Sequence, residues 1–196
     1  MFDGLPYKVV DDFLPEIYHW QLKETLCGPN HPWCFLNNID KQENTLGGFG
    51  FEACVVNSSD PQQIAKGPRS SSISEMIMPF CFSVQQLVGA ESILKVRCDM
   101  TLYNPLGHMH HPHIDHNGPH IASVYYVNDS DGNTVLFNHR ATVNDPKTFP
   151  SLDEMEVLVE VEPRANRLLV FDGNLIHTGH SPSKNNYRVI INSDYC

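Results

Sequence analysis

A ten-residue stretch, Ile93 to Leu102, constrains the fold more than any other part of the sequence. Apolar and polar residues alternate along it, because Leu94, Val96, Cys98, Met100 and Leu102 are separated by Lys95, Arg97, Asp99 and Thr101, with Tyr103 next. A period of two places successive side chains on opposite faces of an extended chain. The stretch therefore predicts a β-strand.

The chain beyond this strand contains further short segments of the same character. They are separated by Gly, Asn, Asp and Pro, and no clear helix interrupts them. The predicted strands are Ile121–Val127, Thr134–Phe137, Glu156–Val161, Leu168–Phe171 and Arg188–Asn192, with Gly132, Gly173 and Gly179 as predicted turn residues. Many short strands joined by such turns are typical of an antiparallel sandwich or jelly roll. We expect residues 93–196 to form this core.

Residues 1–92 differ in character and are expected to support and cover the core. A short strand from Tyr7 to Phe13 leads to a predicted helix over Pro15–Leu26, which Asp11 or Asp12 can cap. The predicted apolar face of this helix comprises Ile17, Trp20, Leu22 and Leu26. A second helix is predicted over Ser74–Val88, with a strand at Phe51–Val56. Loops are predicted at Gly47–Gly50 and over Asn57–Ser72. No linker divides the 196 residues, so we expect one mostly β domain.

Composition and charge exclude several classes of protein. Hydrophobic residues make up 41% of the chain, but no run approaches the roughly 20 apolar residues of a membrane-spanning helix. The net charge of −10 argues against a nucleic-acid partner. The start of the chain lacks the features of a signal peptide, and the six cysteines contain no C-x-x-C pair. We therefore expect a cytoplasmic protein with unpaired thiols.

A histidine-rich stretch over residues 102–126 points to a metal site. It contains His113-Ile114-Asp115, in which the imidazole and the carboxylate lie two residues apart and can reach the same ion. One further histidine would complete a two-histidine, one-carboxylate set, which suits Fe(II) and leaves positions open. His177, which follows a buried strand and a turn, is the predicted third ligand, and His180 is a nearby alternative. The other histidines of the loop are predicted to be solvated: His108, His110, His111, His116 and His120.

An arginine opens the last predicted strand, eleven residues after His177. This residue is Arg188, in the segment R-V-I-I-N. A guanidinium group is the natural bidentate partner of a carboxylate. Arg188 is therefore a candidate for binding an acidic molecule next to the metal.

Taken in order, these motifs resemble the Fe(II)- and 2-oxoglutarate-dependent dioxygenases, in particular their prolyl-4-hydroxylase-like branch with its small phage and bacterial members. The resemblance covers roughly Ile93 to Asn192. It rests on H-x-D, then Y-V-N and D-G-N-T, then N-R-L-L-V-F-D-G-N-L-I-H-T-G, and finally R-V-I-I-N. The N-terminal K-V-V-D-D-F-L-P is also similar to the opening of these small enzymes.

The resemblance implies a double-stranded β-helix and a set of site residues. His113, Asp115 and His177 would bind Fe(II), and Arg188 would bind the distal carboxylate of 2-oxoglutarate. Tyr103, ten residues before the first ligand, would contact the same carboxylate, and Tyr126 would line the pocket. Together with O2, these cosubstrates imply the hydroxylation of a C–H bond.

The substrate implied by the resemblance is a prolyl residue of a protein or peptide. A free amino acid or another small molecule is the first alternative. A non-catalytic jelly roll that keeps its metal, or a cupin-like protein with more histidine ligands, is the second. The sequence leaves the oligomeric state open.

Overall fold

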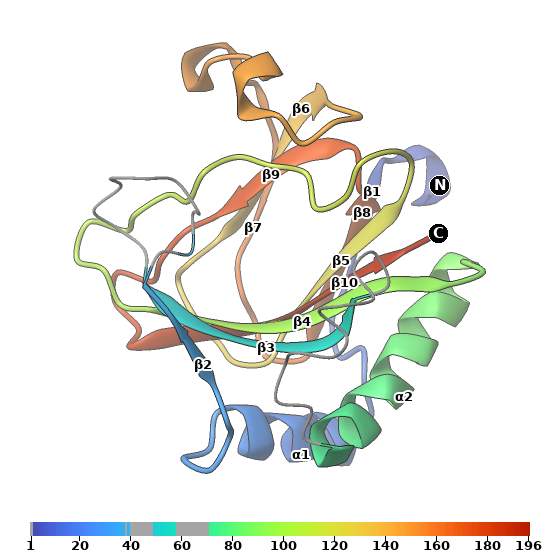
Figure 1. The fold of residues 1–196 in the computed structure, drawn as a ribbon, viewed down its shortest axis with the longest axis vertical. Coiled ribbons are helices and arrows are strands. Elements are labelled where there is room, and N and C mark those ends of the chain that lie inside the picture. The colour runs from blue at the N-terminus through green and yellow to red at the C-terminus, as the bar shows by residue number, and fades with distance from the viewer. Residues whose placement is uncertain (1, 38, 40–48, 58–70) are drawn as a thin grey trace.

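A computed structural model describes residues 2–37, 39, 49–57 and 71–196 of the chain. It contains two antiparallel sheets and two α-helices (Figure 1). The larger sheet is built from β1 (Tyr7–Val10), β2 (Cys34–Leu36), β3 (Gly50–Asn57), β4 (Ile93–Leu102), β5 (Ile121–Tyr126), β8 (Arg167–Asp172) and β10 (Tyr187–Tyr195). The smaller sheet is built from β6 (Thr134–Arg140), β7 (Val157–Val161) and β9 (Leu175–Gly179).

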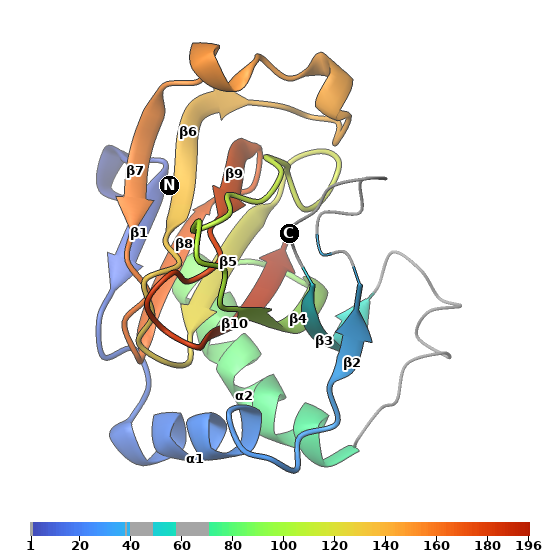
Figure 2. The same ribbon diagram turned by 90° about the vertical axis from the view of Figure 1, so that its left-hand side faces the viewer.

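The order of the strands shows that the chain passes back and forth between the two sheets. The larger sheet has the order β1-β8-β5-β10-β4-β3-β2 and the smaller one β7-β6-β9, so that β5 and β8 pair in one sheet while β6 and β9 pair in the other. The side view shows β6 and β7 on one side of the molecule and the helices at one end (Figure 2). This arrangement is the predicted double-stranded β-helix, or jelly roll.

The space between the sheets is filled by one hydrophobic cluster. Its buried members come from both sheets and are Ala122, Val124, Tyr126, Leu136, Val161, Leu169, Phe171, Leu175 and Ile190. On β5 and β8 these are alternate residues, as a pleated strand with one inward face requires. The core of the barrel thus follows directly from the period-two pattern.

A second cluster joins the other face of the larger sheet to the helices α1 (Glu16–Leu26) and α2 (Ser71–Val88). Leu22 and Leu26 of α1 and Phe80 of α2 are fully or almost fully buried there. Figure 1 shows both helices together on the outside of the sheet. The two helices therefore cover this sheet from one side, whereas β1, β2 and β3, which also precede residue 93, are strands of the sheet itself.

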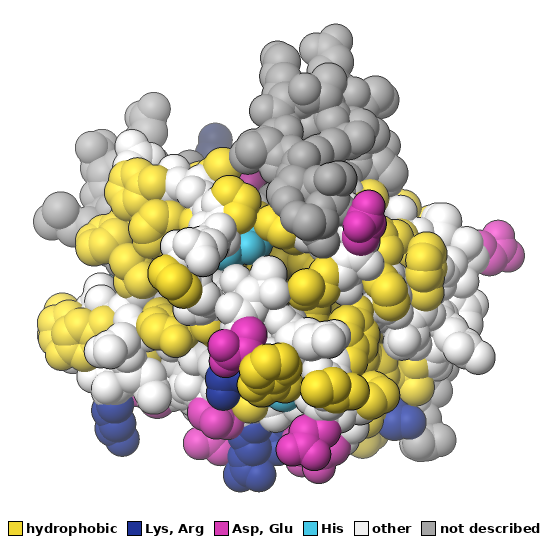
Figure 3. All heavy atoms as spheres, turned by 90° about the horizontal axis from the view of Figure 1, so that it is seen from below, with side chains coloured by type: hydrophobic (Ala, Val, Ile, Leu, Met, Phe, Trp, Pro, Cys, Tyr) yellow, Lys and Arg dark blue, Asp and Glu magenta, His cyan; other side chains and the backbone are white. Residues whose placement is uncertain are grey.

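The predicted apolar face of α1 is only half correct. Ile17 and Trp20 are 65% and 55% exposed, because only the side of the helix with Leu22 and Leu26 faces the sheet. Figure 3 shows the molecule from below, where hydrophobic side chains are interspersed with polar and charged ones.

The start of α1 also differs from the prediction. Pro15 is the N-cap residue, and no side chain caps the helix. The carboxylate of Asp11 instead accepts hydrogen bonds from Nε and Nη2 of Arg167, at 2.5 and 3.0 Å. The adjoining strand ends at Val10 rather than at Phe13, since Asp12 has a φ of 50° and breaks the extended chain.

Most predicted strands are confirmed, but two were missed, the three-residue strand β2 and the strand β9. The strand β9 lies where a turn followed by a histidine was expected. Two short 3-10 helices, η3 (Pro146–Thr148) and η4 (Leu152–Glu154), also interrupt the connection between β6 and β7. A third, η1 (Phe2–Gly4), precedes β1.

Three further expectations concern the remainder of the chain. Among the cysteines whose side chains are described, none forms a disulfide bond; Cys81 and Cys98 are buried, and Cys34 and Cys196 are exposed. In the described ranges, no helix has the length and apolar character needed to cross a membrane. Most of the predicted loop over Asn57–Ser72, and the first half of the glycine-rich run, lie outside the described residues.

Candidate metal centre

The three predicted metal ligands lie together at one end of the barrel. His113 and Asp115 belong to the long connection between β4 and β5, and His177 lies in the middle of β9. The backbones of His113 and His177 form an antiparallel bridge with two hydrogen bonds of 2.9 Å. One ligand atom from each of the three side chains can be chosen so that all lie within 4.8 Å of one another.

Both histidines present the same ring nitrogen to the centre. Nδ1 of His113 lies 2.9 Å from the carbonyl oxygen of His111, and Nδ1 of His177 lies 3.0 Å from that of Leu175. A carbonyl oxygen only accepts, so each Nδ1 carries a proton, and Nε2 is the ring nitrogen left to bind a metal. The Nε2 atoms lie 4.0 Å (His113) and 3.2 Å (His177) from the oxygens of Asp115. A hydrogen bond from Nδ1 to a backbone oxygen, as seen for both residues, commonly orients histidine ligands of metals.

The electrostatics of the metal-free site differ between its three side chains. Burial and the neighbouring His177 lower the pKa of His113 to about 4, so that this imidazole is neutral at pH 7. Burial alone would raise the pKa of Asp115, but Lys95 and the hydrogen bond with His177 hold it well below its usual range. Burial would likewise lower the pKa of His177, and the interaction with Asp115 outweighs this and raises it. A cation would displace that shared proton.

Arg188 lies between the two sheets, near the same site. Its side chain is buried, and Nη2 donates a 2.8 Å hydrogen bond to Oγ1 of Thr134 on β6. Nε is buried without a hydrogen-bond partner, and no carboxylate of the described residues forms an ion pair with this guanidinium. Burial lowers the pKa of Arg188. A buried charge without a counter-ion is costly, so the residue is suited to an anion that comes from outside the chain.

One glycine makes space for this arginine, since a Cβ at Gly179 would lie 2.8 Å from Nη1 of Arg188. At Gly132 a Cβ would first meet the backbone oxygen of His180, and Cδ of Arg188 would lie 3.2 Å away. Gly179, predicted to be a turn residue, is in fact the last residue of β9. Small size, rather than turn geometry, explains the glycine at this position.

The two predicted tyrosines are placed differently. Tyr126 is fully buried, and its ring centre lies 5.8 Å from Cζ of Arg188. Its buried hydroxyl faces Thr134 and Arg188 but makes no well-formed hydrogen bond. Tyr103 is 50% exposed just after the end of β4. Tyr126 thus packs against Arg188, whereas a contact of Tyr103 with a cosubstrate stays a prediction.

The alternative ligand and the additional histidines lie outside the group of three. His180 forms a bridge with Met109, and its Nδ1 lies 3.3 Å from the carbonyl oxygen of Asn133. The prediction of solvated histidines was wrong for His110 and His120, which are 8% and 6% exposed. His110 accepts a 2.6 Å hydrogen bond at its backbone oxygen from Thr178, so it fixes the loop against β9.

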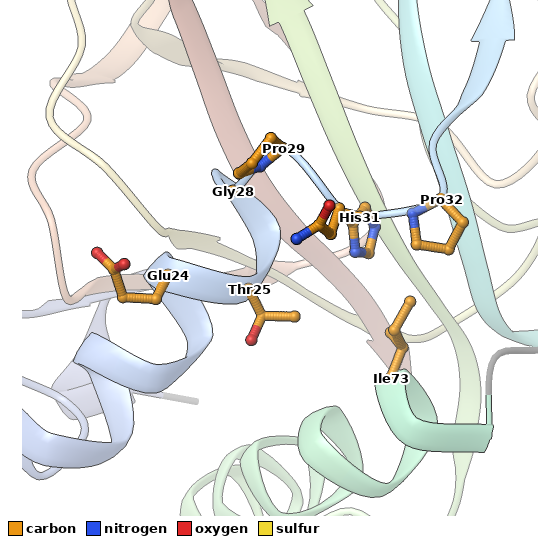
Figure 4. A pocket seen from close by; sticks show the side chains of 8 residues that line it. Glu24, Thr25, Gly28, Pro29, His31, Pro32 and Ile73 are labelled. Carbon is orange, nitrogen blue, oxygen red and sulfur yellow. The ribbon is translucent and has the colours of Figure 1, made fainter.

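A cavity of about 330 Å³ opens beside the three ligands. Its lining includes His113, Asp115, Lys95 and Arg97. A second cavity, of about 470 Å³, lies beyond the end of α1 around His31 (Figure 4). This second cavity contains none of the predicted site residues.

Sequence reasoning missed three residues of the site. Lys95 forms a 3.3 Å ion pair with Asp115, and Thr134 holds Arg188. Asp194 is 2% exposed, and burial together with the charge of Asp115 raises its pKa to about 8. Lys95 stands on the polar side of the alternating strand, which was a usable signal. Thr134 and Asp194 carried no such signal in the sequence, because their position near the site depends on how the strands are arranged in the two sheets.

No protein-family model and no curated protein matches the sequence. Several solved structures do match over almost the whole chain. A prolyl hydroxylase from Trichoplax adhaerens, in complex with a peptide of hypoxia inducible factor, aligns with a TM-score of 0.61 and 15% identity, over 98% of this chain and 84% of that one. A Pseudomonas putida prolyl-4-hydroxylase aligns with a TM-score of 0.53 and 15% identity, over 98% of this chain and 93% of that one.

The third match is SnoN, the α-ketoglutarate-dependent epimerase of nogalamycin biosynthesis. It aligns with a TM-score of 0.64 and 13% identity, over 97% of this chain and 76% of that one. At such low identity, a structural match speaks for the fold. The chain has the double-stranded β-helix fold of these enzymes.

Proposed function

We propose that this protein is an Fe(II)- and 2-oxoglutarate-dependent dioxygenase that hydroxylates a C–H bond. The observation that carries the proposal is the combination of three metal ligands with a buried, unpaired arginine in one barrel. Three ligands alone are compatible with a metal that only stabilises the fold, and an arginine alone is compatible with any anion. Together they provide one place for a metal and another for the acidic end of a cosubstrate.

The donor set fits Fe(II). Two imidazoles and one carboxylate form the set that leaves further positions open on non-haem iron. Structural zinc sites, in contrast, close their coordination with four protein ligands. Among the described residues, His113, Asp115 and His177 form the one group of this kind, which also disfavours a cupin-like site with more histidines.

The position of Arg188 fits 2-oxoglutarate. Its guanidinium lies against Gly179, two residues along the inner face of β9 from the ligand His177. Two residues of a strand span roughly 7 Å, which a five-carbon dicarboxylate can bridge. One carboxylate would bind Arg188 next to Thr134, and the other end would lie at the metal.

When bound, Fe(II) and 2-oxoglutarate supply the chemistry: O2 and 2-oxoglutarate are converted to succinate and CO2 while one oxygen atom enters the substrate as a hydroxyl group. The chain itself binds, orients and shields. His113, Asp115 and His177 hold the metal on one side. Arg188 and Thr134 orient the cosubstrate, and the buried ring of Tyr126 excludes water from that end.

The resemblance in sequence favours a prolyl residue of a protein or peptide as substrate. Solved structures of the same fold include a prolyl hydroxylase with a bound peptide and SnoN, an epimerase from nogalamycin biosynthesis. A small molecule therefore stays the alternative. The net charge of −10 argues against nucleic acid, and we propose a cytoplasmic location.

Turnover of the cosubstrate tests the proposed function. We expect purified protein with Fe(II), ascorbate and O2 to convert 2-oxoglutarate to succinate, slowly without substrate and faster with it. A panel of proline-containing peptides and amino acids is then screened for the mass of one added oxygen. His113→Ala should abolish both signals, and His180→Ala should retain them. No succinate from wild-type protein under any of these conditions would refute the proposal.

A further inference from the structure

The cavity beside the three predicted metal ligands, the triad of His113, Asp115 and His177, contains two positively charged side chains. Lys95 and Arg97 line it, and the other charged residue of its lining is the predicted ligand Asp115. The whole chain has only 13 lysines and arginines against 23 acidic residues. Two of the few cations therefore meet in a space of about 330 Å³ next to the metal ligands.

The two cations stand on the same face of one strand. Lys95 and Arg97 are two residues apart on β4, so both side chains face the inside of the barrel. Arg97 is held in place by Asp99, with Nε 2.8 Å from Oδ1, and more loosely by Glu52, 3.5 Å from Nη1. Asp99 in turn accepts a hydrogen bond from Asn192. Arg97 is therefore positioned before any ligand arrives.

Lys95 is paired with the metal ligand itself. Its Nζ lies 3.3 Å from Oδ1 of Asp115. A divalent cation on this carboxylate would neutralise the charge that Lys95 now faces. With its side chain 24% exposed towards the cavity, Lys95 then has a positive charge to offer to a ligand.

These cations are distinct from the predicted site of the cosubstrate. In the pairing of β4 with β10, Arg97 lies opposite Asn192, whereas Arg188 lies opposite Thr101. Four residues along a strand correspond to roughly 13 Å. Asp115 contacts Lys95, and His177 lies two residues from the glycine against Arg188. The triad thus lies between two separate positive sites.

We propose that Lys95 and Arg97 bind a carboxylate of the substrate, placed next to the carbon that is oxidised. This inference rests on the proposed function and specifies the substrate of the same site. The carboxylate has two possible sources: a small free acid such as an amino acid, or an acidic side chain beside the reacting residue of a peptide. Both place the same chemical group in the cavity.

Matched ligand pairs test this proposal by binding alone. The protein is loaded without oxygen with Fe(II) and saturating 2-oxoglutarate, which keeps added acids from competing at Arg188. Calorimetric titrations then compare free amino acids with their amides, and capped proline peptides containing Asp or Glu with those containing Asn or Gln. We expect at least one acid in the panel to bind at least tenfold more tightly than its neutral partner.

Variants assign the preference to the two cations. Arg97→Gln and Lys95→Gln should each reduce the ratio of acid to neutral binding to less than about threefold. Arg164→Gln removes the same charge from an exposed position and should leave the ratio unchanged. If Arg97→Gln fails to fold because Asp99 loses its ion pair, the comparison of Lys95→Gln with wild type still tests the proposal.

Each outcome is informative. A preference for free acids or for acidic peptides supports the proposal and identifies the source of the carboxylate. Equal binding of acids and neutral partners, no binding by any member of the panel, or a preference that survives both substitutions overturns it. The absorbance band of the Fe(II)–2-oxoglutarate complex is recorded on the same sample. If that band is missing, the proposed function fails, whereas a band without acid preference refutes the assignment of the cavity only.

Discussion

The inner face of the large sheet has two parts with opposite chemistry. On β5 and β8 it is apolar, and residues such as Val124 and Leu169 pack against the smaller sheet. On β4 and the end of β10 it is charged, with Lys95, Arg97 and Asp194. The two parts belong to one continuous hydrogen-bonded sheet. The same scaffold thus separates a region that stabilises the fold from one that lines the cavity beside the predicted metal ligands.

The largest effect is expected in the charged part. His177→Ala removes one of the three predicted metal ligands and should lower Fe(II) affinity by at least about 100-fold, since even residues that only support metal ligands are worth 10- to 100-fold. Anaerobic metal titration measures this loss. His180→Ala, three residues further on, should bind Fe(II) like wild type. Equal losses in both variants would show that the ligand assignment is wrong.

A substitution in the apolar part should change the stability of the fold instead of the affinity for Fe(II). Leu169→Ala leaves a cavity at a fully buried position and should lower the free energy of unfolding by about 2–5 kcal/mol. Urea unfolding measures it. Leu152→Ala, at a position 47% exposed, should change it by less than about 0.5 kcal/mol. The comparison breaks down if Leu169→Ala folds normally but loses Fe(II) affinity.

Arg188 lies where the two parts meet. Its substitution should therefore lower the affinity for 2-oxoglutarate without lowering the free energy of unfolding. Arg188→Met removes charge-assisted hydrogen bonds worth about 1.5–3 kcal/mol, which corresponds to roughly 10- to 100-fold in 2-oxoglutarate affinity. It also removes a buried, unpaired charge, so the unfolding free energy should stay equal or rise. Calorimetry and urea unfolding test both statements. A marked loss of stability would indicate that Arg188 has a structural role.

The last prediction concerns the pH dependence of stability. Burial and the charge of Asp115 raise the pKa of Asp194 to about 8 in the metal-free protein, above the ordinary value of 3.8 for this side chain. Between these values the folded state binds the extra proton, so stability falls as pH rises, by up to about 1.4 kcal/mol per pH unit. Asp194→Asn should flatten this fall between pH 5 and 8. Asp153→Asn, at an exposed position, should leave it unchanged.

Features that depend on local spacing could be predicted from the sequence. The alternation along β4 predicted its strand, and the two-residue spacing of His113 and Asp115 predicted that both would face one point. The strand β9 was missed, because Asp172-Gly173-Asn174 indicates a turn and only five residues follow in the strand. Local periodicity could not distinguish so short a strand from a loop.

Features that depend on packing could not be predicted. Ile17 and Trp20 are apolar but exposed, since the position of α1 on the sheet decides which side is covered. Thr134 contacts Arg188 only because β6 and β10 lie in facing sheets. The contact of Lys95 with Asp115 likewise requires the β4–β5 loop to fold back over its own strand.

The most direct test of the central claim is an anaerobic absorbance titration of metal-free protein with Fe(II) and then 2-oxoglutarate. We predict a visible charge-transfer band in wild type that is absent in His113→Ala and weakened in Arg188→Ala. Binding of Fe(II) by wild type without any such band on addition of 2-oxoglutarate would contradict the central claim, because the metal site and the arginine would then not serve one cosubstrate.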